Sequence, residues 1–320
     1  MNQVQDQLRS QAKKLLQDGA VQVVIGHQQG TDPHRVAPLF AETAEEAEQL
    51  ILTPLAGPSV VRYVRGSKQR VAAVVNGCEA RLLQTLIREH QVNRDQVHLI
   101  GVPCAGKADI DKLAARPEVD LRKLTGVRLE GETVVVETAA GEVKVAKAEV
   151  LRSECQACEA PTSTGCDETV GEETGPPAVQ DLELGALQGL SREERLAAFR
   201  RAFERCVRCY ACVNSCSLCY CTVCFAEQTK PQWIPRVVEL PENMAFHLGR
   251  AMHLAGRCVR CGACDRACPA GVPLRALYEQ MAAEIADLFG EEMTGPDQEA
   301  PFLVFRPEDT EQAIDGSVKH

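Results

Sequence analysis

The sequence has no long apolar run, no surplus of basic charge and no apolar leader segment. No uninterrupted apolar stretch approaches the roughly 20 residues that a transmembrane helix needs. The 45 acidic residues outnumber the 35 basic ones, which gives a formal net charge of −10. Basic patches of the kind that bind nucleic acid or anionic membranes are absent. The first ten residues are polar, so we expect a chain in the reducing cytoplasm, without nucleic acid and without direct membrane insertion.

Signatures of nucleotide binding and of catalysis are also missing. The glycine-containing loops match neither the phosphate-binding loop nor the dinucleotide fingerprint G-x-G-x-x-G. His247 and His253 are six residues apart, on different faces of a predicted helix, and we expect them to pack or to donate hydrogen bonds. Lys107 and Asp109 could contact a substrate, but solvated loop charges explain them better. We therefore identify no catalytic residue, and the sequence does not favour a small-molecule substrate.

Cysteine is what the chain has in quantity. Sixteen of the 320 residues are cysteines, and eight of them lie in two runs with the same spacing, C-x2-C-x2-C-x3-C. The first run consists of Cys206, Cys209, Cys212 and Cys216. The second, which is followed by Pro269, consists of Cys258, Cys261, Cys264 and Cys268. This spacing lets one loop place three thiolates around a 4Fe–4S cube while the fourth reaches another cube. We therefore predict a pair of 4Fe–4S clusters.

Paired runs of this kind usually exchange their last cysteines. One cluster would be held by Cys206, Cys209, Cys212 and Cys268, and the other by Cys258, Cys261, Cys264 and Cys216. Because crossing ties the two loops together, loss of the clusters should unfold this part of the chain. The alternatives fit less well. Disulfide frameworks are typical of small secreted domains, and four-cysteine zinc sites usually use two separated C-x2-C pairs.

A third set of cysteines follows predicted strands. Cys78 comes directly after the apolar stretch 71–75, and Cys104 directly after the stretch 97–100. Ligands of open α/β sheets bind at the carboxyl ends of the strands. Cys155 and Cys158 add a C-x2-C pair. Taken singly, Cys78 and Cys104 are better explained as inert buried thiols. Together the four thiols fit a third iron–sulfur cluster or an all-cysteine zinc site, and we favour the cluster.

Three further cysteines lie just beyond the first run. Cys219, Cys221 and Cys224 fall within six residues, and thiols so close together are reactive when left free. Metal binding is therefore one interpretation, with Cys166 as a candidate fourth ligand. The alternative is that Cys166 is a spare thiol. A fourth cluster remains open on the sequence alone.

The order of predicted elements indicates two domains. Apolar strands at 21–25, 71–75 and 97–100 alternate with helices at 4–17, 41–51 and 79–90, and a β-meander follows at 127–150. This pattern predicts an α/β N-terminal domain over residues 1–160 with a mostly parallel sheet and a cysteine-rich sheet edge. An acidic linker is expected at 161–190. An all-α C-terminal domain of helical-ferredoxin type, holding the two clusters, is expected at 191–290. The tail 291–320 is expected to be anchored by Phe302–Phe305.

Three stretches resemble a known family. They are Val71–Arg81, the loop Ile100–Gly106, and the block Cys206–Cys224 with its continuation Gln228–Trp233. They are similar to the beta subunit of the deazaflavin-coenzyme-reducing hydrogenases and formate dehydrogenases. The similarity is greatest to the iron–sulfur relatives of that subunit that accompany heterodisulfide-reductase-like complexes in anaerobes. The resemblance implies an electron-transfer subunit of a larger cytoplasmic oxidoreductase, with the other subunits as partners.

The same resemblance raises a flavin alternative. The characterised beta subunits bind FAD and reduce the deazaflavin coenzyme, so FAD is a further candidate cofactor. Their glycine-rich flavin segment has at most a remnant here, at Gly26–Gly30. The first hypothesis is therefore a non-catalytic conduit that relays electrons through several 4Fe–4S clusters. The second is a flavin-containing subunit that itself reduces a deazaflavin or nicotinamide. A heterodisulfide-reductase catalytic subunit would need an adjacent Cys-Cys pair, which the sequence lacks.

Overall fold

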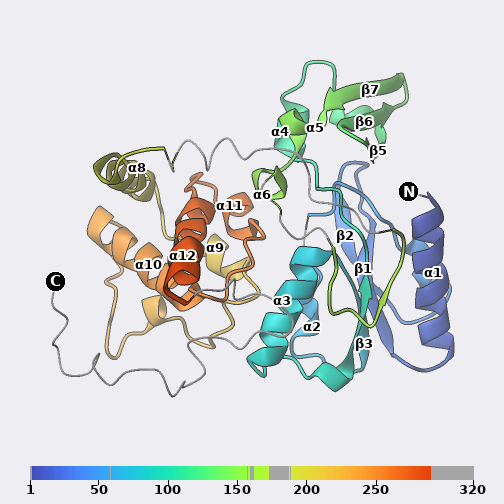
Figure 1. The fold of residues 1–320 in the computed structure, drawn as a ribbon, viewed down its shortest axis with the longest axis horizontal. Coiled ribbons are helices and arrows are strands. Elements are labelled where there is room, and N and C mark those ends of the chain that lie inside the picture. Colours follow the sequence, from blue (N-terminus) through green and yellow to red (C-terminus); the bar gives the residue numbers. More distant parts are fainter. Residues whose placement is uncertain are drawn as a thin grey trace.

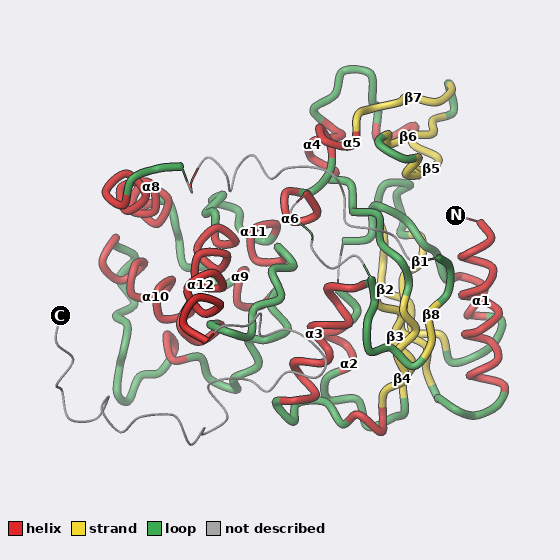
Figure 2. Tube along the Cα trace, viewed as in Figure 1, coloured by secondary structure: helices red, strands yellow, loops and turns green. Residues whose placement is uncertain are grey.

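The computed structural model describes residues 2–57, 59–156, 158, 162–172, 187 and 189–289. Strands gather in one half of the molecule, and the described part of the other half is helical (Figures 1 and 2). The predicted α/β N-terminal region and all-α C-terminal region are therefore confirmed. The domain boundaries stay predictions, and the expected anchor Phe302–Phe305 lies outside the described residues.

The main sheet has the strand order β2-β1-β3-β4-β8. Strands β1, β3, β4 and β8 run parallel to one another, and the edge strand β2 pairs antiparallel to β1. The sheet is thus mixed, with parallel pairing throughout its centre, where the apolar runs of β3 and β4 are buried. The strands are β1 Val23–Gln29, β2 Val36–Ala41, β3 Val71–Val75, β4 Val97–Gly101 and β8 Glu168–Thr169.

Successive residues of the central strands alternate between the two faces of the sheet. Val24, Ala72 and Val74 pack on the side covered by α1 (Asn2–Gln17). Ile25 and Ala73 point to the opposite side, covered by α3 (Gly77–Arg88) and α2 (Val61–Val64) (Figure 1). The core on that second side continues without a break into the helical region. A shared core therefore fixes the sheet relative to the helices.

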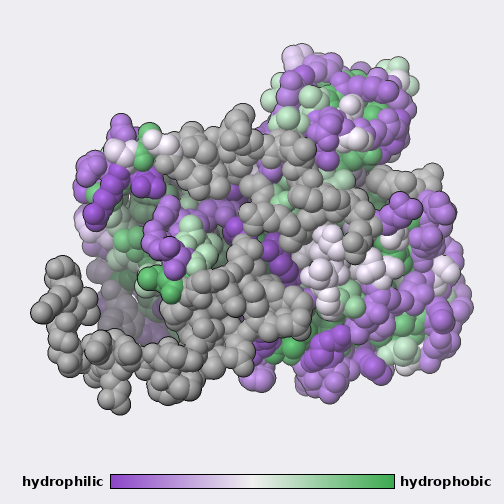
Figure 3. All heavy atoms as spheres, viewed as in Figure 1, coloured by the Kyte–Doolittle hydropathy of each residue, from purple (hydrophilic) through white to green (hydrophobic). Residues whose placement is uncertain are grey.

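The predicted meander forms a separate antiparallel sheet, β5-β6-β7. It has a hydrophobic core of its own, and the surface visible in Figure 3 over this sheet is largely hydrophilic. Its elements and the short helices between the two sheets are β5 Leu124–Glu130, β6 Thr133–Thr138, β7 Gly141–Ala146, α4 Ile110–Ala114, α5 Lys147–Val150 and α6 Ser153–Gln156.

In the helical region, α10 packs against both α8 and α12. A capping box of Ser191 and Glu194 begins α8. Asn243 of α10 is buried and donates from Nδ2 to the carbonyl oxygens of Phe203, at 2.9 Å, and Cys206, at 2.8 Å. The bond to Cys206 joins α10 to the start of the first cysteine run. The helices are α8 Arg192–Glu204, α9 Ala211–Asn214, α10 Leu240–Leu254, α11 Ala263–Arg266 and α12 Leu274–Phe289.

Single-turn 3-10 helices complete the described elements: η1 Glu46–Gln49, η2 Arg94–Gln96, η3 Leu121–Lys123 and η4 Phe225–Glu227. The helix predicted over 41–51 is wrong, because η1 is the only helical turn there. Ala41 instead ends the edge strand β2, which the sequence prediction missed. The carboxylate of Glu46 accepts the backbone N–H groups of Glu42, at 2.7 Å, and Thr43, at 3.2 Å. These bonds turn the chain where a helix would have had to begin.

Residues 162–172, expected to belong to an exposed linker, instead pack on the sheet. Strand β8 pairs with β4, and Ser163 is buried with its hydroxyl 3.1 Å from the carbonyl oxygens of Val75 and Val102. Asp167 pairs with Arg94 at 2.6 Å and accepts the N–H of Leu99 at 2.7 Å. The polar side chains that suggested an exposed linker thus form hydrogen bonds and an ion pair at the edge of the sheet.

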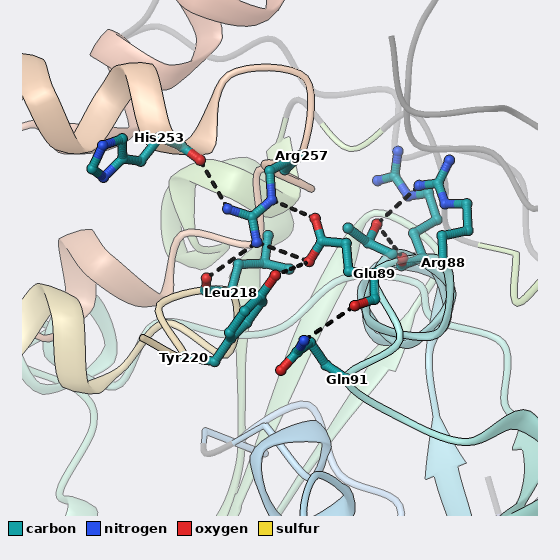
Figure 4. A network of polar contacts seen from close by, with 9 residues as sticks. Arg88, Glu89, Gln91, Leu218, Tyr220, His253 and Arg257 are labelled. Atoms are coloured by element: carbon teal, nitrogen blue, oxygen red, sulfur yellow. Dashed lines mark hydrogen bonds and ion pairs between the residues drawn. The ribbon is translucent and has the colours of Figure 1, made fainter. Parts of the chain in front are cut away.

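A buried polar contact joins the two regions (Figure 4). Glu89, just after α3, accepts from the guanidinium of Arg257, with one bond of 2.8 Å, and from the hydroxyl of Tyr220 at 3.0 Å. The guanidinium also lies over the Tyr220 ring, 5.3 Å from its centroid. Tyr220 lies between two cysteines, and Arg257 directly precedes Cys258. The contact therefore connects α3 to both cysteine-rich segments.

Candidate metal centres

The two cysteine runs adopt the same backbone conformation. In the first run Arg208 and Tyr210 have φ of 45° and 59°, and in the second Arg260 and Gly262 have φ of 57° and 65°. A short helix, α9 or α11, follows each loop. Left-handed conformations are strained for arginine and tyrosine, and such strain is concentrated at functional sites. The repeat in sequence is therefore a repeat in structure.

The thiols of the first run gather around the last cysteine of the second. Burial raises the pKa of Cys206, and the neighbouring Cys268 and Cys209 raise it further. Burial also raises the pKa of Cys212 to about 11, with Cys206 and Cys268 again among its charged neighbours. Backbone N–H groups point at two of these sulfurs, from Arg208 to Cys206 and from Val272 to Cys268, each at 3.4 Å. The loops thus bring these four thiols together.

Two thiols of the second run, those of Cys258 and Cys261, have Cys216 as a charged neighbour. Burial raises the pKa of Cys258 to about 12, and Cys216 adds to that rise. Burial raises the pKa of Cys261 and of Cys264 well above the usual range, and Cys258 is a charged neighbour of both. The last cysteine of each loop thus lies near cysteines of the other loop, Cys268 near Cys206 and Cys216 near Cys258. Buried thiols of raised pKa stay protonated until a metal supplies the compensating charge, and this donor set fits such a group.

A pocket lies between the sheet edge and the second run. It is lined by cysteines from both regions: Cys78, Cys104, Cys155, Cys158 and Cys261. Cys78 lies in the first turn of α3, Cys104 follows β4, and Cys155 belongs to α6. Burial raises the pKa of Cys78 and of Cys155 to about 12, and Cys104 is a charged neighbour of both. The structure thus brings the third cysteine set together.

Cations surround this pocket. Lys107, Arg152 and Arg266 line it beside the thiols. Arg152 is buried, and burial lowers its pKa below the usual arginine range. Arg266 forms an ion pair with Glu154, and burial lowers the pKa of this arginine to about 10. Guanidinium groups held in a buried pocket of thiols favour an anionic occupant, as a thiolate-ligated cluster is. The residues present therefore fit the third predicted site.

The extra thiols beyond the first run do not form a comparable set. Cys219 forms a hydrogen bond with Cys216, which lowers the pKa of Cys216. Cys221 is exposed, and Cys224 has Cys221 among its charged neighbours. Burial raises the pKa of Cys166 to about 11, but the charged groups acting on it are Asp167 and Arg94. Cys166 therefore belongs to the sheet edge near β8 and does not join the other three.

Among the described residues, no group of three or more His, Cys, Asp or Glu side chains is arranged to hold a metal ion. A cube differs from an ion because its cysteines bind separate irons at its corners. The assignment of cluster ligands therefore stays a prediction. Within the part of the chain that the structure describes, no helix is both long and apolar enough to span a membrane.

Three arginines near the thiols were missed by sequence reasoning: Arg152, Arg266 and Arg250. A signal existed for the last one. Arg250 follows Phe246 and precedes Leu254 by four residues each, which puts a cation on the buried face of α10. No comparable pattern marks Arg152 or Arg266, whose burial depends on contact between the two regions.

The other candidate residues have structural explanations. His247 is buried against Phe203, with ring centroids 4.6 Å apart, and neither ring nitrogen has a hydrogen-bond partner in the described residues. It packs and does not donate. Asp109 caps α4 by accepting two backbone N–H groups. Lys107 lines the cysteine pocket, so it is not simply a solvated charge. The segment that could be a remnant of a flavin loop, Gly26–Gly30, lies mainly in β1.

Comparisons with known proteins agree with this arrangement. Residues 68–186 match the family model for the C-terminal part of the beta subunit of coenzyme F420 hydrogenase/dehydrogenase. This segment contains the third cysteine set and ends before the two runs. The chain is 26% identical over 342 residues to the F420-dependent formate dehydrogenase subunit beta of Methanocaldococcus jannaschii, covering 87% of this chain and 88% of that one.

A second relative is the F420-dependent formate dehydrogenase 1 subunit beta of Methanococcus maripaludis, 24% identical over 76% of this chain and 78% of its own length. Among solved structures, the F420-reducing [NiFe] hydrogenase complex of Methanosarcina barkeri matches with a TM-score of 0.44 and 16% identity, over 50% of this chain and 60% of that chain. These similarities agree with the predicted resemblance to the beta subunits of the F420-dependent hydrogenases and formate dehydrogenases.

Proposed function

We propose that this chain is the iron–sulfur electron-transfer subunit of a multi-subunit cytoplasmic oxidoreductase of formate dehydrogenase, hydrogenase or heterodisulfide-reductase type. One observation carries the proposal: three cysteine sets form a continuous series. Cys261 belongs to the second set, lines the pocket of the third, and has both Cys216 and Cys78 among its charged neighbours. Cys212, in the first set, is four residues before Cys216. Electrons would therefore pass along the series within one chain.

The ends of this series differ in exposure. Cys209, in the first set, is exposed, which suits exchange of electrons with another subunit. The third set lies at the carboxyl edge of the sheet, in a pocket lined by side chains of both regions. The relatives named above are beta subunits, so we propose that other subunits of the complex supply and accept the electrons. The exposed Trp233, near the extra thiols, is a candidate contact for such a subunit.

In this proposal the protein residues hold and insulate the carriers. Bound 4Fe–4S clusters supply one-electron redox chemistry, and the thiolates fix their positions. Two like loops, each followed by a short helix, support the proposed helical-ferredoxin type. Two clusters are proposed in the helical region and a third at the sheet edge, where Arg152 and Arg266 face the thiols. A fourth, at Cys219, Cys221 and Cys224, has less support, since Cys221 is exposed.

Metal analysis of the anaerobically purified chain tests the proposal. Four irons per cube predict about twelve irons and twelve sulfides for three clusters, about eight for the helical pair alone and about sixteen for four. Zinc without sulfide would refute the redox role.

A pair of cysteine variants tests the third site. Cys78→Ser should lose about four irons per chain, because it removes one of the four pocket thiols. Cys166→Ser is the matched control, since Cys166 is also a half-buried thiol near the sheet but lies beside Asp167 and Arg94. Equal iron content in the two variants would refute a third cluster at the sheet edge.

A second candidate function is a flavin-containing subunit that itself reduces a deazaflavin or nicotinamide. Its support is another pocket, at the carboxyl ends of β1, β3 and β4, lined mainly by apolar side chains and adjoining the third set at Cys104 and Lys107. Acid precipitation of the purified complex followed by absorption spectroscopy tests it. Release of stoichiometric FAD supports this function, and a flavin-free complex refutes it.

A further inference from the structure

A buried arginine lies between the two cysteine sets of the helical region. Arg250 of α10 is 3% exposed. One guanidinium nitrogen donates to the carbonyl oxygen of Cys212 at 3.0 Å, and another donates to the hydroxyl of Tyr278. The guanidinium carbon lies 5.2 Å from the centroid of the Tyr278 ring. Its Nε is buried without a hydrogen-bond partner among the described residues.

The groups around Arg250 are thiols, not carboxylates. Its contacts are neutral, so its charge is not balanced by an ion pair within the described residues. A buried guanidinium without a counter-charge costs several kcal/mol. Cys219, Cys216 and Cys264 are the sulfur groups that interact with its charge. A counter-charge in this place would therefore have to come from the sulfurs.

The thiols facing Arg250 come from both sets. Arg250 donates to the carbonyl oxygen of Cys212, which belongs to the first set, and its charge acts on the Cys212 thiol. Its charge also acts on the thiols of Cys258 and Cys264 in the second set. A positive charge near a cluster stabilises the reduced, more negative state over the oxidised state, and so raises the reduction potential. A charge between two clusters acts on both.

We propose that Arg250 is a shared positioning residue that raises the reduction potentials of both clusters of the helical region together. The inference rests on the proposed function, because it requires clusters at these thiols. Its consequence is that both clusters become easier to reduce, while the difference between their potentials does not depend on Arg250. The bond from Arg250 to the Cys212 carbonyl also holds α10 against the first loop.

Redox titration of the anaerobically purified full chain, followed by electron paramagnetic resonance, tests this proposal. Arg250→Gln removes the charge and keeps a polar side chain. At a fixed potential, the ratio of reduced to oxidised cluster should fall at least tenfold for both clusters, which is about 59 mV for a one-electron couple. Arg250→Lys keeps the charge but lacks the planar fork, so both ratios should fall by a smaller factor. Arg201→Met removes an arginine charge from an exposed position of α8 and should change neither ratio.

The outcomes separate the two proposals. A wild-type chain without clusters refutes the proposed function itself. A wild-type chain with two clusters, together with an iron-loaded Arg250→Gln variant of unchanged potentials, refutes only the role of Arg250. A shift in one cluster alone also refutes the shared role. If Arg250→Gln does not retain iron, Arg250→Met is the second variant without the charge: a fall in both ratios supports the proposal, and two unchanged ratios overturn it.

Discussion

The contact of Glu89 with Arg257 and Tyr220 gives the sharpest prediction about stability. Replacing Glu89 with Gln keeps the size of the side chain and removes its charge. The Glu89 side chain is 5% exposed and that of Arg257 is 24% exposed, so the ion pair is mostly shielded from water. The variant would leave the guanidinium without its carboxylate, and Tyr220 would lose its charged acceptor.

The magnitude follows from that exposure. Removing one partner of a fully buried ion pair costs about 3–5 kcal/mol, whereas an exposed pair contributes about 0–1 kcal/mol. Because Arg257 remains partly accessible to water, we expect Glu89→Gln to lower the free energy of unfolding by about 2–4 kcal/mol. At about 2 °C per kcal/mol, suited to a large chain, the melting temperature should fall by about 4–8 °C.

The measurement is the melting temperature by far-UV circular dichroism, at one scan rate and under anaerobic conditions. Glu48→Gln is the matched control. Glu48 pairs with Lys13 where the two side chains are 53% and 32% exposed, so its loss should cost less than about 1 kcal/mol. If the two variants melt at the same temperature, the buried contact does not stabilise the joint between the regions.

Three further predictions concern single residues. Burial lowers the pKa of His247 to about 4. Between about pH 6.5 and 4, His247 is therefore protonated in the unfolded chain but neutral in the folded chain. Stability should fall as pH drops from about 6.5 toward 4, by at most about 1.4 kcal/mol per pH unit, and His247→Leu should show a shallower loss between about pH 6.5 and 5 in urea titrations. Asn243→Ala should lower the free energy of unfolding by about 2–3 kcal/mol, measured by the same titrations, because it leaves the buried carbonyl of Cys206 without its donor. Gly262→Ala should lower the melting temperature more than Gly19→Ala. The two glycines have φ of +65° and +66°, but an added Cβ meets a side-chain carbon at 2.5 Å only at Gly262. Equal effects would mean that the neighbouring side chain moves aside freely.

Local pattern predicted most of the regular structure. The apolar stretch 71–75 is β3 to the residue, and α1 and α3 begin within two residues of their predicted starts. The errors occur where a side chain bonds to backbone. Glu46 turns the chain where a helix was expected, and Ser163 draws an acidic, polar segment onto the sheet. Composition alone does not distinguish such a carboxylate or hydroxyl from a solvated one.

By itself, the sequence determined which thiols share a loop, because the spacing within each run fixes this, and it predicted their cluster chemistry. It also indicated the sheet edge, because Cys78 and Cys104 directly follow apolar strands. Only the tertiary structure decided how the sets lie relative to one another. It brings Cys261 to the pocket of Cys78 and puts the charge of Arg250 between the two runs. These relations depend on packing between segments far apart in the chain, through a core shared by the sheet and the helices. Local periodicity carries no information about such packing.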